Sequence, residues 1–127
     1  VSLIKDAGLP LEYVSFFGFQ EDLNEFYKEI DVFVLSSKTE GFPNVLVEAA
    51  LLGCLCIASN AGDSALILSN KSRIFPIKDY KKLAEILSYY LSCDEIELSI
   101  NIRTDNEYIV DNFSIDKFNK SLVACYV

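Results

Sequence analysis

The amino-acid sequence predicts an α/β protein with a Rossmann-like parallel sheet and helices on both faces. Short apolar runs that suit buried strands alternate with longer segments in which apolar residues recur every three to four positions. Such alternation is typical of parallel strands joined by right-handed helical crossovers. The chain has 127 residues, the length of one domain, and it contains neither an internal repeat nor a linker.

Four segments are predicted to be strands, because each is a short run rich in Val, Ile, Leu or Phe. They are residues 13–18 (YVSFFG), 31–37 (DVFVLSS), 55–59 (LCIAS) and 73–77 (RIFPI). Pro76 lies near the end of the last run, and proline is tolerated in edge strands. We therefore expect residues 73–77 to form an edge strand and the other three segments to be buried.

The two helices nearest the predicted site are indicated by apolar spacing and by terminal residues. Residues 21–30 place on one helix face Leu23, Phe26, Tyr27 and Ile30. Residues 43–53 begin with Pro43 at the expected first helical position and end at Gly53, a common residue just past a helix.

Further helices are predicted after residue 62. A short helix is expected at about 63–69 and an amphipathic helix at 79–91, with Asp79 as its N-cap. The residues that this second helix is expected to bury are Leu83, Ile86, Leu87 and Tyr90. The C-terminal tail is predicted to hold two more helices, the last of which begins at Ser114 and buries Ile115, Phe118 and Leu122.

The charge of the chain argues against two classes of partner. The net charge is −8, and no run of basic residues is longer than Lys81-Lys82. Nucleic acids and anionic membrane surfaces are bound chiefly by clustered Lys and Arg, so we expect neither partner. No apolar run reaches the roughly 20 residues that a membrane span needs. A small anionic ligand remains compatible with this charge, because a helix N-terminus binds phosphate without a basic side chain.

The cysteines favour packing over metal binding. They are Cys54, Cys56, Cys93 and Cys125, and the chain has no histidine. Cys54 and Cys56 lie in an apolar stretch, where free thiols behave as small hydrophobic side chains. A Cys-x-Cys pair alone is weak support for a metal site, so we expect structural thiols and no bound metal. Reduced thiols are typical of cytosolic proteins, which predicts a cytoplasmic location.

The segment SSKTEGFPNVLVEAALLG has the features of a ligand-binding loop followed by a helix. It follows a predicted strand, and ligands of parallel sheets bind at the carboxyl ends of the strands. The residue before Pro43 is Phe42, whose side chain cannot cap the helix. The amides of Asn44, Val45 and Leu46 are therefore expected to be unpaired donors at the positive end of the helix dipole. Their acceptor is either a phosphate group or water.

Two glutamates bracket this helix start. Glu48 is the only charged residue between Glu40 and Asp63, and it lies in an otherwise apolar stretch of the predicted helix. In one interpretation Glu48 simply faces solvent. In the other it accepts hydrogen bonds from vicinal hydroxyl groups, such as those of a ribose, which offsets its desolvation. The residues alone leave both interpretations open.

Residues 9 to 92 resemble a known enzyme family. The segment SSKTEGFPNVLVEAALLGCLCIASNAGDSALIL, with seven residues between Glu40 and Glu48, is similar to the signature of retaining GT-B glycosyltransferases of family 4, the glycosyl transferases group 1 family. The preceding segment, VSFFGFQEDLNEFYKEIDVFVLSS, resembles the same family. The resemblance implies transfer of a sugar from a nucleoside diphosphate with retention of configuration and without a required metal or other cofactor.

The resemblance also implies a role for each residue of the predicted site. Glu40 matches the glutamate that contacts the donor sugar near the reacting centre, and it is the predicted catalytic residue. Glu48 matches the residue that binds the ribose. The other implied donor-binding residues are Gly41, Phe42 and Pro43 at the sugar hydroxyls, Asn44, Val45 and Leu46 at the diphosphate, and Phe19 and Gln20 near the base.

The expected domain is partial. The resemblance implies that residues 1–127 belong to the C-terminal half of a GT-B fold, ending in C-terminal helices. We expect the first strands of that nucleotide-sugar-binding domain, its basic residues for the diphosphate and the N-terminal acceptor domain to be absent from this chain. The expected partners are a UDP- or GDP-sugar donor and a glycan or lipid-linked acceptor. The expected location is cytoplasmic, peripheral to the inner face of the membrane in a longer protein active in surface polysaccharide synthesis.

Two other functions compete with donor binding. A non-catalytic nucleotide-binding or interaction module would keep the fold without turnover and would self-associate through an exposed sheet edge. Another α/β enzyme of GT-B shape, such as a sugar epimerase or phosphorylase, would need histidine or a cofactor lysine. We find neither motif in the sequence.

Overall fold

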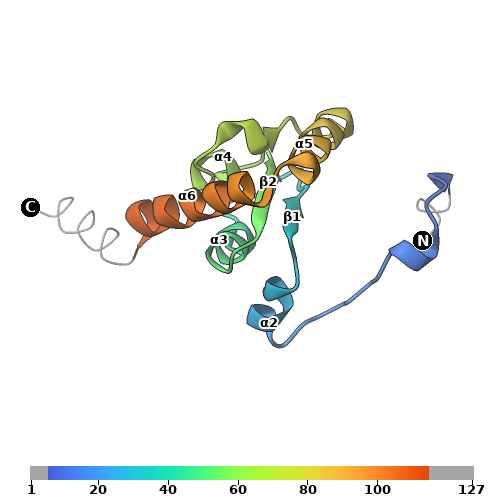
Figure 1. The fold of residues 1–127 in the computed structure, drawn as a ribbon, viewed down its shortest axis with the longest axis horizontal. Helices are drawn as coiled ribbons and strands as arrows, with labels where there is room; N and C mark the ends of the chain where they lie inside the picture. Colours follow the sequence, from blue (N-terminus) through green and yellow to red (C-terminus); the bar gives the residue numbers. More distant parts are fainter. Residues whose placement is uncertain (1–5, 115–127) are drawn as a thin grey trace, which may run out of the picture.

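The computed structural model describes residues 6–114, which form a small parallel sheet covered by helices (Figure 1). In chain order the elements are the 3₁₀ helix η1 (Leu11–Tyr13), α2 (Leu23–Lys28), β1 (Val32–Leu35), α3 (Asn44–Leu51), β2 (Leu55–Ser59), α4 (Ser64–Ile67), the 3₁₀ helix η2 (Lys71–Arg73), β3 (Ile74–Phe75), α5 (Tyr80–Ser92) and α6 (Glu95–Phe113).

The three described strands form one parallel sheet in the order β1-β2-β3. Val32 of β1 pairs with Leu55 of β2, and Ala58 of β2 pairs with Ile74 of β3. Every residue of β2 is buried, as expected for a central strand. The predicted edge strand is confirmed in β3, which pairs only with β2 in this sheet. The expectation that residues 31–37 form a buried strand is wrong in part, because β1 lies at the other edge of the described sheet and is only half-buried.

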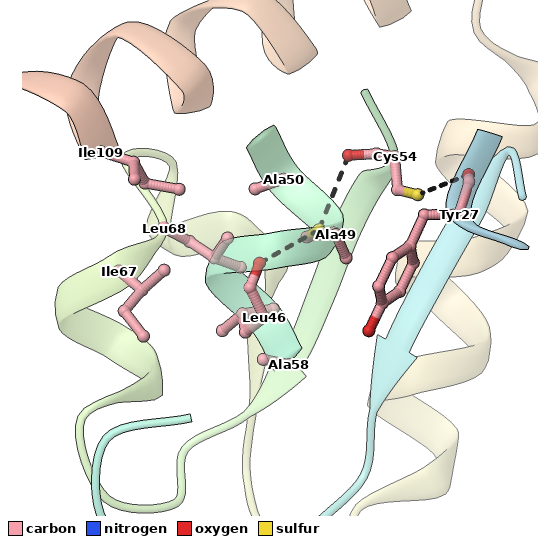
Figure 2. Packing of buried hydrophobic residues seen from close by; sticks show 10 residues of the cluster. Tyr27, Leu46, Ala49, Ala50, Cys54, Ala58, Ile67, Leu68 and Ile109 are labelled. Atoms are coloured by element: carbon pink, nitrogen blue, oxygen red, sulfur yellow. Dashed lines mark hydrogen bonds between the residues drawn. The ribbon is translucent and has the colours of Figure 1, made fainter. Parts of the chain in front are cut away.

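The two faces of β2 contribute to two apolar cores. Cys54 immediately before the strand, and Cys56 and Ala58 within it, face a core shared with α3, α4 and α6, where Leu46, Ala49, Ala50, Ile67, Leu68 and Ile109 are buried (Figure 2). The alternate residues Leu55 and Ile57 face a second core with Phe75, Ile86 and Tyr90. Successive strand residues point to opposite faces, so this division follows from the period of two. Helices therefore cover both faces of the sheet, as predicted.

Cys54 and Cys56 are packed in the first core with no exposed surface. The Cys54 thiol donates to the carbonyl of Tyr27 at 3.3 Å, and the Cys56 thiol contacts the carbonyl of Cys54 at 3.5 Å (Figure 2). Burial raises the pKa of both thiols above the usual range, which keeps them protonated. Their position and their hydrogen bonds are those of structural thiols.

The prediction of a buried strand at residues 13–18 is wrong. The segment ends η1 and then runs as an extended chain away from the sheet (Figure 1), with Tyr13, Phe16 and Phe17 at 78%, 70% and 63% exposure. A strand forms only when a neighbouring strand supplies hydrogen bonds to its backbone. None of the described strands pairs with this segment, so its β-forming residues have no ladder to join.

The predicted helices are confirmed with some changes at their ends. Pro43 is the N-cap of α3 and not its first helical residue, while Gly53 follows the helix with φ of 92°. Asp79 caps α5 as predicted, because its carboxylate accepts the Lys82 amide at 2.9 Å. In α2, Tyr27 is buried but Leu23 is exposed.

The C-terminal helices were predicted in part. The first of the two is α6, whose N-cap Asp94 accepts the Glu97 amide at 2.8 Å. Ser114 is the C-cap of α6. The second predicted helix, with Ile115, Phe118 and Leu122, lies outside the described residues.

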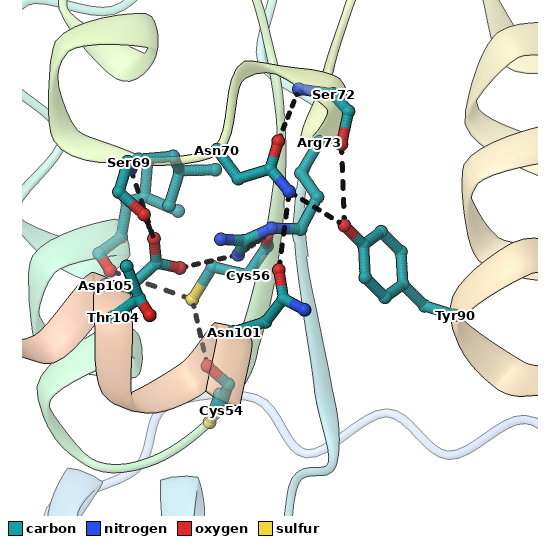
Figure 3. Close-up of polar contacts among 12 residues, drawn as sticks. Cys54, Cys56, Ser69, Asn70, Ser72, Arg73, Tyr90, Asn101, Thr104 and Asp105 are labelled. Atoms are coloured by element: carbon teal, nitrogen blue, oxygen red, sulfur yellow. Dashed lines mark hydrogen bonds and ion pairs between the residues drawn. The ribbon is translucent and has the colours of Figure 1, made fainter. Parts of the chain in front are cut away.

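A buried ion pair ties α6 to the sheet (Figure 3). The Arg73 guanidinium and the Asp105 carboxylate are 2.5 Å apart and almost fully buried. Arg73 also donates to the carbonyl of Cys56 in β2 at 2.9 Å, and Asp105 accepts from the amide and hydroxyl of Ser69. These bonds connect α6, β2 and the segment before β3. The Asp105 carboxylate is therefore compensated by groups from other parts of the chain, whereas Nε and Nη2 of Arg73 are buried without a hydrogen-bond partner among the described residues.

Removing the carboxylate should strongly destabilise the fold. Asp105→Ala leaves the Arg73 guanidinium buried without its counter-charge, which costs about 3–5 kcal/mol for pairs of this kind. Urea denaturation of both proteins measures the change in the free energy of unfolding. Arg103→Ala is the matched control, because its ion pair with Glu107 lies on the surface of the same helix, and it should leave that free energy nearly unchanged. A loss below about 1 kcal/mol for Asp105→Ala would show that the pair is not a structural tie.

Candidate functional site

The candidate site is built by two loops at the carboxyl end of the sheet. Residues 36–43 follow β1 and lead into α3, and residues 60–63 follow β2 and lead into α4. Because β1 and β2 are parallel neighbours, their loops emerge at the same edge. This is the edge where doubly wound proteins bind their ligands.

The second loop supports the first through backbone contacts. The Asp63 amide donates to the carbonyl of Gly41 at 3.0 Å, and the Ser59 hydroxyl donates to the carbonyl of Ser37 at 2.6 Å. Gly62 has φ of 53°, and a Cβ built at this position would lie 2.2 Å from the carbonyl oxygen of Glu40. Only glycine allows this approach. The conformation of residues 40 and 41 is therefore set by the loop after β2.

The start of α3 offers backbone amides without a side-chain cap. Pro43 is the N-cap and supplies no side-chain hydrogen bond to the helix. The Leu46 amide donates to the carbonyl of Pro43 at 3.0 Å, so the expectation that it is unpaired is wrong. The Leu46 N–H is therefore used in the first turn of α3, where a bond to the residue three positions back tightens the helix. Asn44 and Val45, both exposed, remain as the amide donors at the positive end of the helix.

The two glutamates lie on either side of this helix start in the sequence and differ in exposure. Glu40 is half-buried in the supported loop, and Glu48 is exposed on α3. Helical side chains lean toward the N-terminus, so Glu48 projects over the turn that contains Asn44. Burial raises the pKa of Tyr27 in α2, and the charge of Glu48 raises it further.

The end of α6 packs against the loop at residues 36–43 through an aromatic contact. The rings of Phe42 and Phe113 lie 5.5 Å apart, and Phe113 also contacts Tyr108 at 6.3 Å. Phe113 was not among the predicted site residues. Periodicity marks it as one apolar residue of a helix, and no local pattern links it to a loop so far away in the sequence.

Phe19 and Gln20 are held near α2. The Gln20 side chain donates to the carbonyls of Phe17 and Phe19, and the Phe17 ring contacts Phe26 at 5.3 Å. Gln20 and Phe17 also line a groove of about 280 Å³ beside α2. Within residues 6–114, no hydrogen bond or ring contact joins Phe19 or Gln20 to residues 36–48. The structure therefore brings together the predicted residues from 40 to 48 but not these two.

The described residues contain neither a candidate membrane span nor a candidate metal site. None of the helices within residues 6–114 is both long and apolar enough to cross a membrane. The same part of the chain contains no group of three or more Cys, Asp or Glu side chains arranged to hold a metal ion.

Comparison with known proteins identifies the family. Residues 2–93 match the family model of glycosyl transferases group 1, and the chain belongs to this family. The fold agrees. The C-terminal domain of a glycosyl transferase group 1 family protein (LpcC) from Francisella tularensis superposes with a TM-score of 0.73 at 22% identity, over 90% of this chain and 60% of that one. The class of protein is thus a glycosyltransferase domain with the α/β fold of a GT-B C-terminal half.

The relatives with similar sequences include a bacterial glycosyltransferase and a bacterial polysaccharide biosynthesis protein. The chain is 31% identical over 110 residues to the UDP-Gal:alpha-D-GlcNAc-diphosphoundecaprenol alpha-1,3-galactosyltransferase of Escherichia coli, covering 87% of this chain and 28% of that protein. It is 42% identical over 55 residues to the Vi polysaccharide biosynthesis protein VipC/TviE of Salmonella typhi, covering 43% of this chain and 10% of that protein. The chain thus spans about a quarter or less of these relatives' length.

A side chain at position 62 should displace the candidate loop. Gly62→Ala places a methyl group against the carbonyls of Glu40 and Gly41 in a backbone conformation that alanine rarely adopts. We expect a loss of stability of about 1–3 kcal/mol and shifted amide resonances for residues 40–45. Gly41→Ala is the control, because a Cβ there meets nothing within 4 Å and the φ of Gly41 is not positive. Equal effects of the two substitutions would contradict the supporting role of Gly62.

Proposed function

We propose that the chain is the donor-binding part of a retaining, family 4 glycosyltransferase that moves a sugar from a nucleoside-diphosphate sugar to a glycan or lipid-linked acceptor. The observation that carries the proposal is the start of α3, where the exposed residues Asn44 and Val45 begin a helix that has no side-chain cap, after a loop held at the carboxyl end of the sheet. Membership of the glycosyl transferases group 1 family supports the same assignment.

The diphosphate of the donor is proposed to lie against the amides of Asn44 and Val45. These N–H groups and the helix dipole favour negative charge without a basic residue. When the bond between the anomeric carbon and the diphosphate oxygen breaks, the electron pair leaves with the diphosphate, and its charge grows beside these fixed donors. Stabilising charge where it develops lowers the barrier. The proposed chemistry needs no metal. The net negative charge of the chain does not prevent a phosphate group from binding at this helix start.

The two glutamates are proposed to hold the ends of the donor. Glu40, in the loop fixed by Gly62, contacts the sugar, and Gly41, Phe42 and Pro43 line its hydroxyls. Glu48 accepts hydrogen bonds from the ribose, which suits its exposed position one turn along the helix from Asn44. The acceptor hydroxyl forms the new bond on the face that the diphosphate leaves and gives its proton to the departing diphosphate oxygen, so the configuration is retained.

The name of one relative supports a proposal for the location and the acceptor. The galactosyltransferase of Escherichia coli acts, by its name, on a sugar linked through diphosphate to undecaprenol. We propose that the whole protein works in the cytoplasm, at the inner face of the membrane, in surface polysaccharide synthesis. The acceptor site then belongs to a domain that precedes this chain.

One observation favours a second function, that of a non-catalytic interaction module. The outer edge of β1 pairs with none of the described strands, and its residues Val32 to Leu35 are only half-buried. Unpaired edges promote association with another chain. Such a module would self-associate in analytical ultracentrifugation and would not bind nucleotides.

A proline at position 44 tests the proposed diphosphate site without disturbing the helix. Asn44 is the first helical residue, where proline is favoured, and Pro43 before it is extended with ψ of 91°, as a residue before proline should be. Asn44→Pro removes the N–H together with the asparagine side chain, and loss of the N–H should weaken UDP or GDP binding by about 1.5–3 kcal/mol. Calorimetric titration measures the affinity. Asn44→Ala keeps the amide and should bind normally. The proposal fails if the two variants bind equally well.

Removal of the Glu48 carboxylate tests the ribose contact. Titration with UDP, GDP and ADP identifies the preferred nucleotide, and Glu48→Ala should weaken its binding roughly 10- to 150-fold, as the loss of a charge-assisted hydrogen bond predicts. Glu107→Ala, an exposed glutamate on α6, is the control. If none of the nucleotides binds even to a longer protein that includes the preceding strands, the interaction module replaces the donor site.

A further inference from the structure

A polar groove of about 440 Å³ lies between α5, the first half of α6 and the segment before β3. Its volume is within the range of small-molecule sites. It lies apart from the loop at residues 36–43. The loop is contacted by Phe113 at the end of α6, whereas the groove is lined by Glu97 and Asn101 near the beginning of that helix. At 1.5 Å of rise per residue, Glu97 and Phe113 are about 24 Å apart along the helix.

The floor of the groove is a connected set of neutral polar groups (Figure 3). The Asn70 amide nitrogen donates to the Tyr90 hydroxyl at 3.2 Å and to the Asn101 carbonyl oxygen at 3.3 Å. The Asn70 oxygen accepts the Ser72 amide at 3.0 Å. Asn70 is thus held in one orientation before any ligand binds, and it positions the Tyr90 hydroxyl and the Asn101 amide, two groups that both donate and accept. A ligand hydroxyl also does both, so a hydroxyl-rich molecule matches this floor.

The wall of the groove presents a fixed aromatic ring. Tyr89 is 55% exposed, yet its hydroxyl donates to the Glu97 carboxylate at 2.7 Å, which raises the pKa of Tyr89 to about 12 and keeps the donor protonated. Its ring stands at 90° to the buried Tyr90 ring, 5.0 Å away. A ring held in this way offers flat apolar surface at little further cost in side-chain entropy. The apolar face of a sugar ring packs on such a surface.

The charges of the groove select against anions. Its charged lining residues are Lys82, Glu85 and Glu97, and Lys82 is already paired with Glu85 at 3.0 Å. The remaining carboxylate makes the groove net negative, which repels phosphates, nucleotides and uronic acids. We propose that this groove is a binding site for a neutral saccharide, separate from the loop at residues 36–43. Because the two places are far apart on α6, a saccharide and a nucleotide occupy the chain at the same time.

The test is an NMR titration of the ¹⁵N-labelled chain with maltotriose, N-acetyllactosamine and an N-acetylglucosamine trimer. At least one probe should shift the amide resonances of Asn70, Tyr89, Glu97 and Asn101 while those of residues 40–46 stay in place. Tyr89→Ala should weaken this binding at least fivefold. Tyr80→Ala, an exposed tyrosine of the same helix outside the groove, should not. Tyr89→Leu, which keeps an apolar side chain but removes the flat ring, replaces Tyr89→Ala if the latter fails to fold.

Three results would overturn the proposal. The first is that none of the probes shifts the groove resonances at its solubility limit. The second is that glucuronic acid or inorganic phosphate binds in the groove more tightly than the neutral probes. The third is that Tyr80→Ala weakens binding as much as Tyr89→Ala. None of these results bears on nucleotide binding at α3, which is measured by the separate titration with UDP.

Discussion

The site depends on one close contact between two backbone segments, the loop after β2 and the loop after β1. Gly62 brings its chain against the carbonyls of Glu40 and Gly41, and the Asp63 amide binds the second of them. Side chains at this contact would push the loops apart. Because the contact is made by backbone, it sets the position of the loop that leads into α3, whose first residues Asn44 and Val45 are exposed. The functional proposal requires this arrangement, since a mobile loop would lose the advantage of positioned donors.

Helix α6 contacts the sheet, the loop after β1 and the polar groove. Near its middle, Asp105 binds Arg73 in the interior and joins the helix to β2 (Figure 3). At its end, Phe113 packs on Phe42 in the loop after β1. Near its beginning, Asn101 helps to form the floor of the polar groove. A single helix thus supports a candidate nucleotide site and a candidate saccharide site.

Local patterns predicted the central part of the fold. The apolar run at 55–59 gave β2, and Asp79 and Gly53 marked helix ends correctly. The prediction of a strand at residues 13–18 failed because β-forming residues make a strand only beside a partner strand. The prediction of an unpaired Leu46 amide failed because residue types do not show that the first turn of a helix is tightened. The Arg73–Asp105 pair and the Phe42–Phe113 contact join distant parts of the chain, and no spacing rule connects them. The roles of Glu40 and Glu48 came from resemblance, while the residues alone left Glu48 between solvent and ligand.

The most direct test of the account asks whether the start of α3 binds a diphosphate. The amide resonances of Asn44 and Val45 should be followed by NMR as UDP, GDP, uridine and guanosine are added to the ¹⁵N-labelled protein. The account predicts that the preferred diphosphate shifts both resonances strongly and that its nucleoside does not, because the amides bind phosphate oxygens. If the nucleoside and its diphosphate give the same shifts, or if the diphosphate binds while both resonances stay in place, the helix start is not the phosphate site.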